Sequence, residues 1–102
     1  MAITTPRRLS RRSSLVLGAY RTFGISPFSR ADLIHVLWEA DQQLWGLQGF
    51  ENRYPNSILV DRVLANKDFK AWGHVEGLGD GCYRLTAAGI AAGKVLAGRA
   101  AA

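Results

Sequence analysis

Residues 73–89 read GHVEGLGDGCYRLTAAG, and this stretch is the most informative part of the chain about its fold. Two short runs that suit extended backbone, His74–Glu76 and Cys82–Thr86, lie on either side of the turn-forming segment Gly77–Gly81. Such a pattern predicts a β-hairpin with a Gly/Asp turn. The glycine-rich turn does not match a phosphate-binding loop, because no Lys-Ser/Thr pair follows it to open a helix.

The chain on the C-terminal side of the hairpin favours a helix. Thr86 suits its N-cap, and the run over Ala87–Ala97 is rich in the helix former Ala. Gly89 and Gly93 are four residues apart, so they share one face of this helix. That face predicts close packing against a neighbour, either inside the domain or across a dimer.

The chain on the N-terminal side of the hairpin predicts another helix, over Pro55–Asn66. Pro55 suits the first helical position, and apolar residues recur at helical spacing. We expect this apolar stripe to be buried, and its members are Leu59, Val60, Val63 and Leu64. The polar residues of the segment then face outward, and they are Asn56, Ser57, Asp61, Arg62 and Asn66.

Two further helices are expected upstream. The first begins at Ser13 or Ser14 and ends at Phe23, where Gly24 follows. The second covers about Arg30–Leu44 and has apolar residues over much of its circumference, so we expect it to be the central helix of the core. A short helical turn and a loop follow over Trp45–Tyr54.

The chain has 102 residues and one cysteine, Cys82. The length fits a single domain, and one cysteine excludes an intramolecular disulfide and a multi-cysteine zinc site. We expect His35 to pair with Glu39 on a helix surface, because no second His or Cys stands at metal-ligand spacing. No apolar run approaches the roughly 20 residues of a membrane span. We therefore expect a soluble cytoplasmic protein with no membrane partner and no cofactor.

The formal net charge of +5 is concentrated at the N-terminus. Residues 1–31 contain six Arg and no acid, whereas residues 32–102 contain seven bases and eight acids. Residues 1–12 predict a disordered basic arm, with a single folded domain over 13–98 and a frayed tail over 99–102. Three interpretations of the arm stay open: a phosphate-binding extension, an Arg/Ser-rich targeting segment and a solubilising tail.

The expected order of helix, helix, loop, helix, hairpin and helix is that of a winged helix-turn-helix. The run Tyr83-Arg84-Leu85-Thr86-Ala87-Ala88-Gly89 resembles the Y-x-L-T-x-x-G signature of winged-helix regulators of the MarR and PadR type. The runs Ile58–Leu64 and Gly73–Glu76 are similar to their recognition helix and to the entry into their wing. The resemblance covers about Phe28–Leu96 and implies a mainly α fold with a small β-hairpin.

The resemblance also implies where DNA is contacted. The helix Pro55–Ala65 would be the recognition helix, with Asn56, Ser57 and Arg62 facing bases in the major groove. Arg84 on the wing would reach a phosphate. The full set of expected DNA contacts is Arg7, Arg8, Arg11, Arg12, Arg53, Asn56, Ser57, Arg62, Lys67 and Arg84. Four acids on or near these elements oppose DNA binding, and they are Asp61, Asp68, Glu76 and Asp80.

Two functions are compatible with these features. The first is a small, dimeric winged-helix protein that binds double-stranded DNA as a transcriptional regulator or accessory factor. The second is a scaffold subunit whose arm binds an acidic partner or RNA, with exposed aromatic residues among Trp45, Phe50, Tyr54 and Trp72 as its contact patch. An enzyme is not expected, because no paired carboxylates, nucleophile with a base, or metal cluster stands at a suitable spacing.

Overall fold

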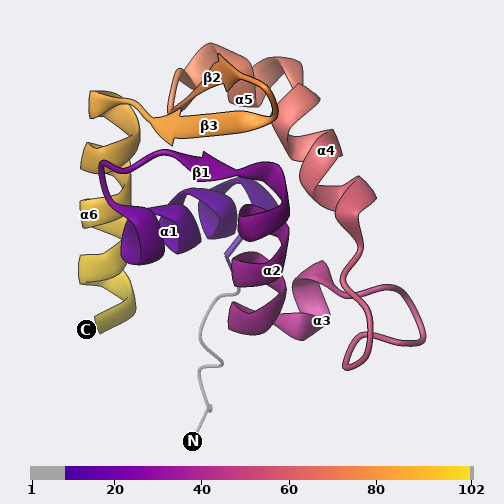
Figure 1. Ribbon diagram of the computed structural model, residues 1–102. Coiled ribbons are helices and arrows are strands. Elements are labelled where there is room, and N and C mark those ends of the chain that lie inside the picture. Colours follow the sequence, from indigo (N-terminus) through magenta and orange to yellow (C-terminus); the bar gives the residue numbers. More distant parts are fainter. Residues whose placement is uncertain (1–8, 102) are drawn as a thin grey trace, which may run out of the picture.

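In the computed structural model, which describes residues 9–101, the chain is mainly helical and carries one small antiparallel sheet (Figure 1). The elements in order are α1 (Arg11–Phe23), β1 (Phe28–Ser29), α2 (Arg30–Ala40), α3 (Gln42–Trp45), α4 (Ser57–Ala65), α5 (Lys67–Trp72), β2 (Val75–Gly79), β3 (Cys82–Leu85) and α6 (Ala87–Ala101). The predicted helix-rich fold with a small β-hairpin is confirmed.

The hairpin forms where the glycine-rich stretch predicts it, but its turn is tighter than expected. Gly79 pairs with Cys82, which leaves Asp80 and Gly81 as a two-residue turn. Both residues have positive φ, 53° and 73°. This backbone is typical of the type I′ turn that joins two twisted strands, and it favours Asp-Gly. The observed turn is shorter than the expected five residues, because Gly77 and Gly79 still pair with β3, across a bulge.

A third strand, β1, completes the sheet in the order β1-β3-β2. Phe28 pairs with Tyr83, and Ser29 pairs with Cys82. Phe28 is buried beneath this pairing. The strand is only two residues long and precedes α2 directly, so no alternating pattern in the sequence indicates it.

The core is centred on α1, whereas we expected α2 to be its central helix. α1 contacts α2, α4, α6 and β3, and its Leu15 and Ala19 are fully buried. α2 ends at Ala40 instead of Leu44 because Asp41 begins a new helix, where its side chain accepts a hydrogen bond from the Leu44 backbone N–H (3.1 Å). The other core residues are Val16, Phe28, Leu33, Ile34, Leu37, Trp45, Val60, Val63, Phe69 and Leu85.

Both ends of the domain extend further than expected. Ser10 caps α1 by accepting a hydrogen bond from the Ser13 backbone N–H (3.2 Å), so the helix starts at Arg11 instead of Ser13. At the other end α6 continues to Ala101, past the start of the tail expected to fray. Within the described stretch 9–101, no helix has both the length and the apolar character to cross a membrane.

The small-residue face of α6 packs inside the domain. A Cβ atom added at Gly89 would collide with the backbone carbonyl of His74, and one added at Gly93 would collide with Tyr20 on α1. Of the two expected uses of this face, the fold therefore uses the intramolecular one.

Candidate nucleic-acid interface

α4 is a short amphipathic helix at the surface. It buries Val60 and Val63 in the core and leaves Ile58, Arg62 and Ala65 exposed on its outer face. The remaining apolar members of the expected stripe, Leu59 and Leu64, are only partly buried.

Of the three side chains expected to read bases, only Arg62 lies fully on this outer face. Asn56 is the residue before the helix and makes no side-chain capping hydrogen bond. Ser57 is the first helical residue, and both side chains are partly buried. Ile58, an apolar residue with no expected role in base contacts, is 58% exposed beside them.

The acid on α4 is neutralised by an arginine from α2. The Asp61 carboxylate accepts two hydrogen bonds from Arg30, one from Nε (2.6 Å) and one from Nη2 (2.7 Å). This hydrogen bonding to Arg30 lowers the pKa of Asp61 and raises the pKa of Arg30. The Arg30 backbone N–H also donates to the carbonyl of Gly81 in the hairpin turn (3.0 Å). Arg30 thus joins α2, α4 and the hairpin, and it removes one of the charges expected to oppose DNA.

The hairpin carries a second internal ion pair. Arg84 on β3 stands directly opposite Glu76 on β2, and its Nε donates to Glu76 Oε1 (2.9 Å). Glu76 therefore has a partner, and Arg84, an expected phosphate contact, is bound within the sheet. Asp80 lies exposed at the turn.

Three arginines from distant parts of the sequence meet in one groove of about 520 Å³, which we call the arginine groove. Arg11 and Arg12 come from the first turn of α1, and Arg62 comes from α4. The groove is lined by Ser10, Arg11, Arg12, Leu59, Arg62, Val63, Asn66 and Trp72. Arg11 and Arg12 thus belong to a helix and not to an arm, whereas Arg7 and Arg8 lie outside the described residues.

Two contacts hold Arg12 in the arginine groove. Its guanidinium carbon lies 5.5 Å from the centroid of the Trp72 ring. Its Nη2 atom lies 3.7 Å from Asp68 Oδ2, and the Asp68 side chain is 74% exposed. Arg11 is held differently, since its Nε donates to the backbone carbonyl of Leu44 (3.3 Å).

The remaining expected contacts, Arg53 and Lys67, are exposed and form no ion pair within the described residues. Lys67 begins α5. Sequence reasoning missed Lys70 on the same helix, which lines a cleft with Asp61 on α4 and Tyr83 on the hairpin. A lysine on a six-residue helix carries no signal in the sequence that would have selected it.

The aromatic patch proposed for a scaffold function is only partly exposed. Trp45 is 1% exposed, and its indole Nε1 donates to Ser14 Oγ (2.9 Å). The expectation that Trp45 contributes to an exposed patch is therefore wrong. Phe50 and Tyr54 are each 53% exposed, and their ring centroids are 6.2 Å apart.

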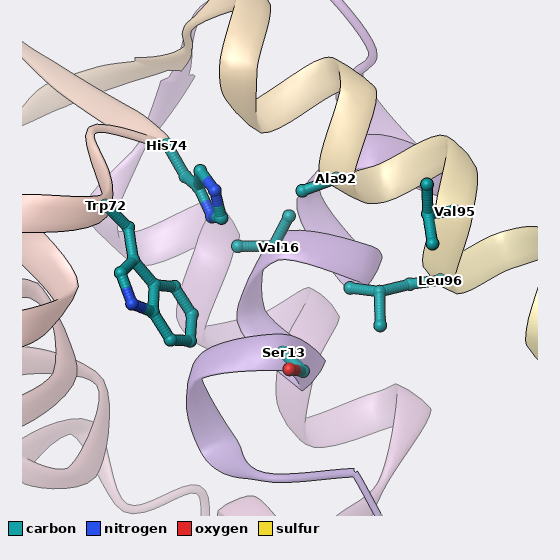
Figure 2. A pocket seen from close by; sticks show the side chains of 7 residues that line it. All are labelled: Ser13, Val16, Trp72, His74, Ala92, Val95 and Leu96. Atoms are coloured by element: carbon teal, nitrogen blue, oxygen red, sulfur yellow. The ribbon is translucent and has the colours of Figure 1, made fainter.

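A second groove, of about 470 Å³, lies between α1 and α6 (Figure 2). Its lining residues are Ser13, Val16, Trp72, His74, Ala92, Val95 and Leu96, none of which is an acid, a lysine or an arginine. The rings of Trp72 and His74 lie 5.2 Å apart in its wall. Because Trp72 also lines the arginine groove, its indole separates an apolar groove from a basic one.

In the part of the chain that the structure describes, no three His, Cys, Asp or Glu side chains are grouped so as to hold a metal ion. His35 instead pairs with Glu39, Nε2 to Oε1, at 3.0 Å. No protein-family model, curated protein or solved structure matches the chain.

Proposed function

We propose that this chain is a winged-helix protein that binds double-stranded DNA, with α4 in the major groove and the β2–β3 hairpin as the wing. The order of elements supports this assignment, because α2 and α4 precede a two-stranded hairpin in the manner of a helix-turn-helix with a wing. The sheet order β1-β3-β2 leaves β2 at one edge, and the cleft lined by Asp61 and Tyr83 lies between α4 and the hairpin.

The observation that carries the proposal is the charge on the exposed face of α4. Arg62 lies there without an ion pair among the described residues, while Asp61 on the same helix is held by Arg30. The acid on β2 is likewise held, by Arg84. An exposed helix whose single acid is compensated and whose arginine is unpaired suits the negative potential of a DNA groove.

A titration of labelled duplex DNA tests the proposal. We expect the full chain to raise the anisotropy of a short duplex, with an affinity that falls steeply between about 50 and about 200 mM salt. Arg62→Ala weakens this binding. Arg21→Ala is the matched control, since it removes the same charge from an exposed position in the last turn of α1. No binding at low salt, or equal effects of the two variants, contradicts the proposal.

The proposal extends to the biological setting. A protein of this kind acts as a transcriptional regulator or accessory DNA-binding factor. It would bind DNA as a homodimer, and it would be located in the cytoplasm or on the nucleoid. Because Gly89 and Gly93 pack inside the domain, the dimer would use another surface, such as the face of α6 that exposes Val95. Sedimentation of the full chain across a range of concentrations tests the dimer.

The exposed pair of Phe50 and Tyr54 favours a second candidate, a protein-interaction module. The loop that carries these rings is held by several backbone hydrogen bonds, among them Leu47 N–H to Tyr54 O (2.8 Å) and Asn56 N–H to Trp45 O (2.8 Å). Aromatic side chains presented on an ordered loop are typical of binding hot spots. Phe50→Ala with Tyr54→Ala leaves DNA binding intact under the first candidate and removes partner binding under the second.

A further inference from the structure

We propose that the arginine groove binds the phosphate backbone of DNA, and that Arg62 contacts phosphate there instead of reading a base edge. The inference rests on the proposed function and names the part of the duplex that this groove holds. It also joins the first turn of α1 and the exposed face of α4 into one contact surface.

The charge of the groove favours an anion. Of its eight lining residues three are Arg and none is an acid. The apolar side chains of Leu59 and Val63 form part of its wall, so the guanidinium groups lie beside low-dielectric surface where their attraction for an anion is stronger than in open water. A phosphodiester backbone is a suitable anion for the arginine groove, because each of its phosphates carries one negative charge.

The contact between Arg12 and Trp72 prepares the guanidinium for phosphate. The guanidinium carbon lies 5.5 Å from the centroid of the indole ring. In this cation–π arrangement the electrons of the ring attract the positive charge. The N–H groups at the guanidinium edge are not used by this contact, and their planar fork matches two phosphate oxygens. Trp72 is 42% exposed, which leaves apolar surface for the sugar next to such a phosphate.

When DNA is absent, Arg12 is paired with Asp68. Arg12 Nη2 and Asp68 Oδ2 are 3.7 Å apart, with side chains that are 36% and 74% exposed. An exposed pair at this distance is weak, so a phosphate replaces the carboxylate readily. Asp68 is then a competitor for Arg12, and its removal strengthens DNA binding.

The test compares Arg12→Ala, Arg62→Ala, Asp68→Asn and the control Arg21→Ala on two duplexes of unrelated sequence. Each lost phosphate contact flattens the salt dependence by about 0.9 log units per log unit of salt. Between about 50 and about 200 mM salt, the parent therefore loses about 3.5-fold more affinity than Arg12→Ala or Arg62→Ala does. Asp68→Asn binds about two- to fivefold more tightly. Both duplexes give the same changes, because phosphates carry no sequence information.

Several results overturn the inference while the proposed function stands. One is duplex binding whose salt dependence is the same in the parent, Arg12→Ala and Arg62→Ala. Another is an Arg62→Ala variant that weakens binding to one duplex and not to the other, which identifies a base contact. An Asp68→Asn variant with unchanged or weaker affinity excludes the competition with Asp68.

A parent chain that binds no duplex refutes the proposed function itself. Inorganic pyrophosphate then serves as the probe, with the tryptophan fluorescence of the parent compared with that of Trp72→Phe. A fluorescence change that is lost in both Trp72→Phe and Arg12→Ala assigns the groove to a small phosphate-bearing ligand and overturns the backbone assignment.

Discussion

Two alanine substitutions on α6 are predicted to change stability in opposite directions. Gly89 and Gly98 lie on the same helix, and Ala is favoured over Gly in a helix interior by about 1 kcal/mol. A Cβ at Gly98 has open space around it, whereas a Cβ at Gly89 collides with the His74 carbonyl and lies 3.1 Å from Leu85 Cδ2. Gly98→Ala is therefore stabilising by about 0.5–1 kcal/mol.

For Gly89→Ala the cost of the collision exceeds the gain in helix propensity. Overpacking costs roughly 1–3 kcal/mol. The carbonyl that must move also accepts a hydrogen bond from the Thr86 backbone N–H (3.0 Å), whose loss costs about 1 kcal/mol. After subtraction of the propensity gain of about 1 kcal/mol, the net destabilisation is about 1–3 kcal/mol.

Urea denaturation followed by circular dichroism measures both variants. The two free energies of unfolding are expected to differ by about 1.5–4 kcal/mol, and each kcal/mol shifts the melting temperature of a domain of this size by roughly 4–8 °C. A Gly89→Ala variant as stable as Gly98→Ala would refute the close approach of α6 to the segment before β2.

Three further variants test other parts of the structure. Asp61→Asn lowers the melting temperature at neutral pH, because it removes the ion pair with Arg30 that lowers the pKa of Asp61. The higher stability of the parent is complete above the ordinary carboxyl pKa of about 3.9 and disappears as the pH falls through the folded-state pKa of Asp61. A stability difference between parent and variant that persists in strong acid contradicts this origin. Val63→Ala is destabilising by about 1–3 kcal/mol, whereas the exposed Ile58→Ala changes the free energy of unfolding by less than about 0.5 kcal/mol, and comparable losses in urea melts would show that the facing of α4 is wrong. Asp80→Lys at the hairpin turn tightens binding to any duplex in anisotropy titrations, and unchanged affinity on two unrelated duplexes argues against a wing next to DNA.

The parts of the fold set by local chemistry could be predicted from the sequence. Asp80 and Gly81 tolerate the positive φ that a tight hairpin turn requires, so the hairpin is visible in the residues themselves. A serine directly before a helical run is a typical N-cap. Ser29 caps α2 in this way, and its hydroxyl accepts a hydrogen bond from the Asp32 backbone N–H (3.0 Å). Ser10 caps α1 in the same way, but Ser13 and Ser14 offer equally good caps, so the sequence leaves that boundary open.

The proposed interface depends on contacts between distant residues, which no local pattern indicates. Arg12 and Arg62 are fifty positions apart and meet only because α1 packs beside α4. Arg30 and Asp61 are thirty-one positions apart, so their pairing does not appear in a charge count along the chain. An arginine near an acid in the fold can be a phosphate contact or an internal partner. Only the tertiary arrangement shows that Arg84 is paired with Glu76, whereas Arg62 has no ion pair among the described residues.

We propose that α4 and its neighbours lie on duplex DNA, and backbone amide NMR can detect this contact residue by residue. Addition of an unlabelled duplex at low salt is expected to shift the amide resonances of Ile58–Ala65, of the first turn of α1 and of the turn at Asp80. Resonances of the loop around Phe50 and of the C-terminal half of α6 are expected to stay in place. Shifts confined to that loop or to α6, or no shifts at all, would show that α4 does not contact DNA.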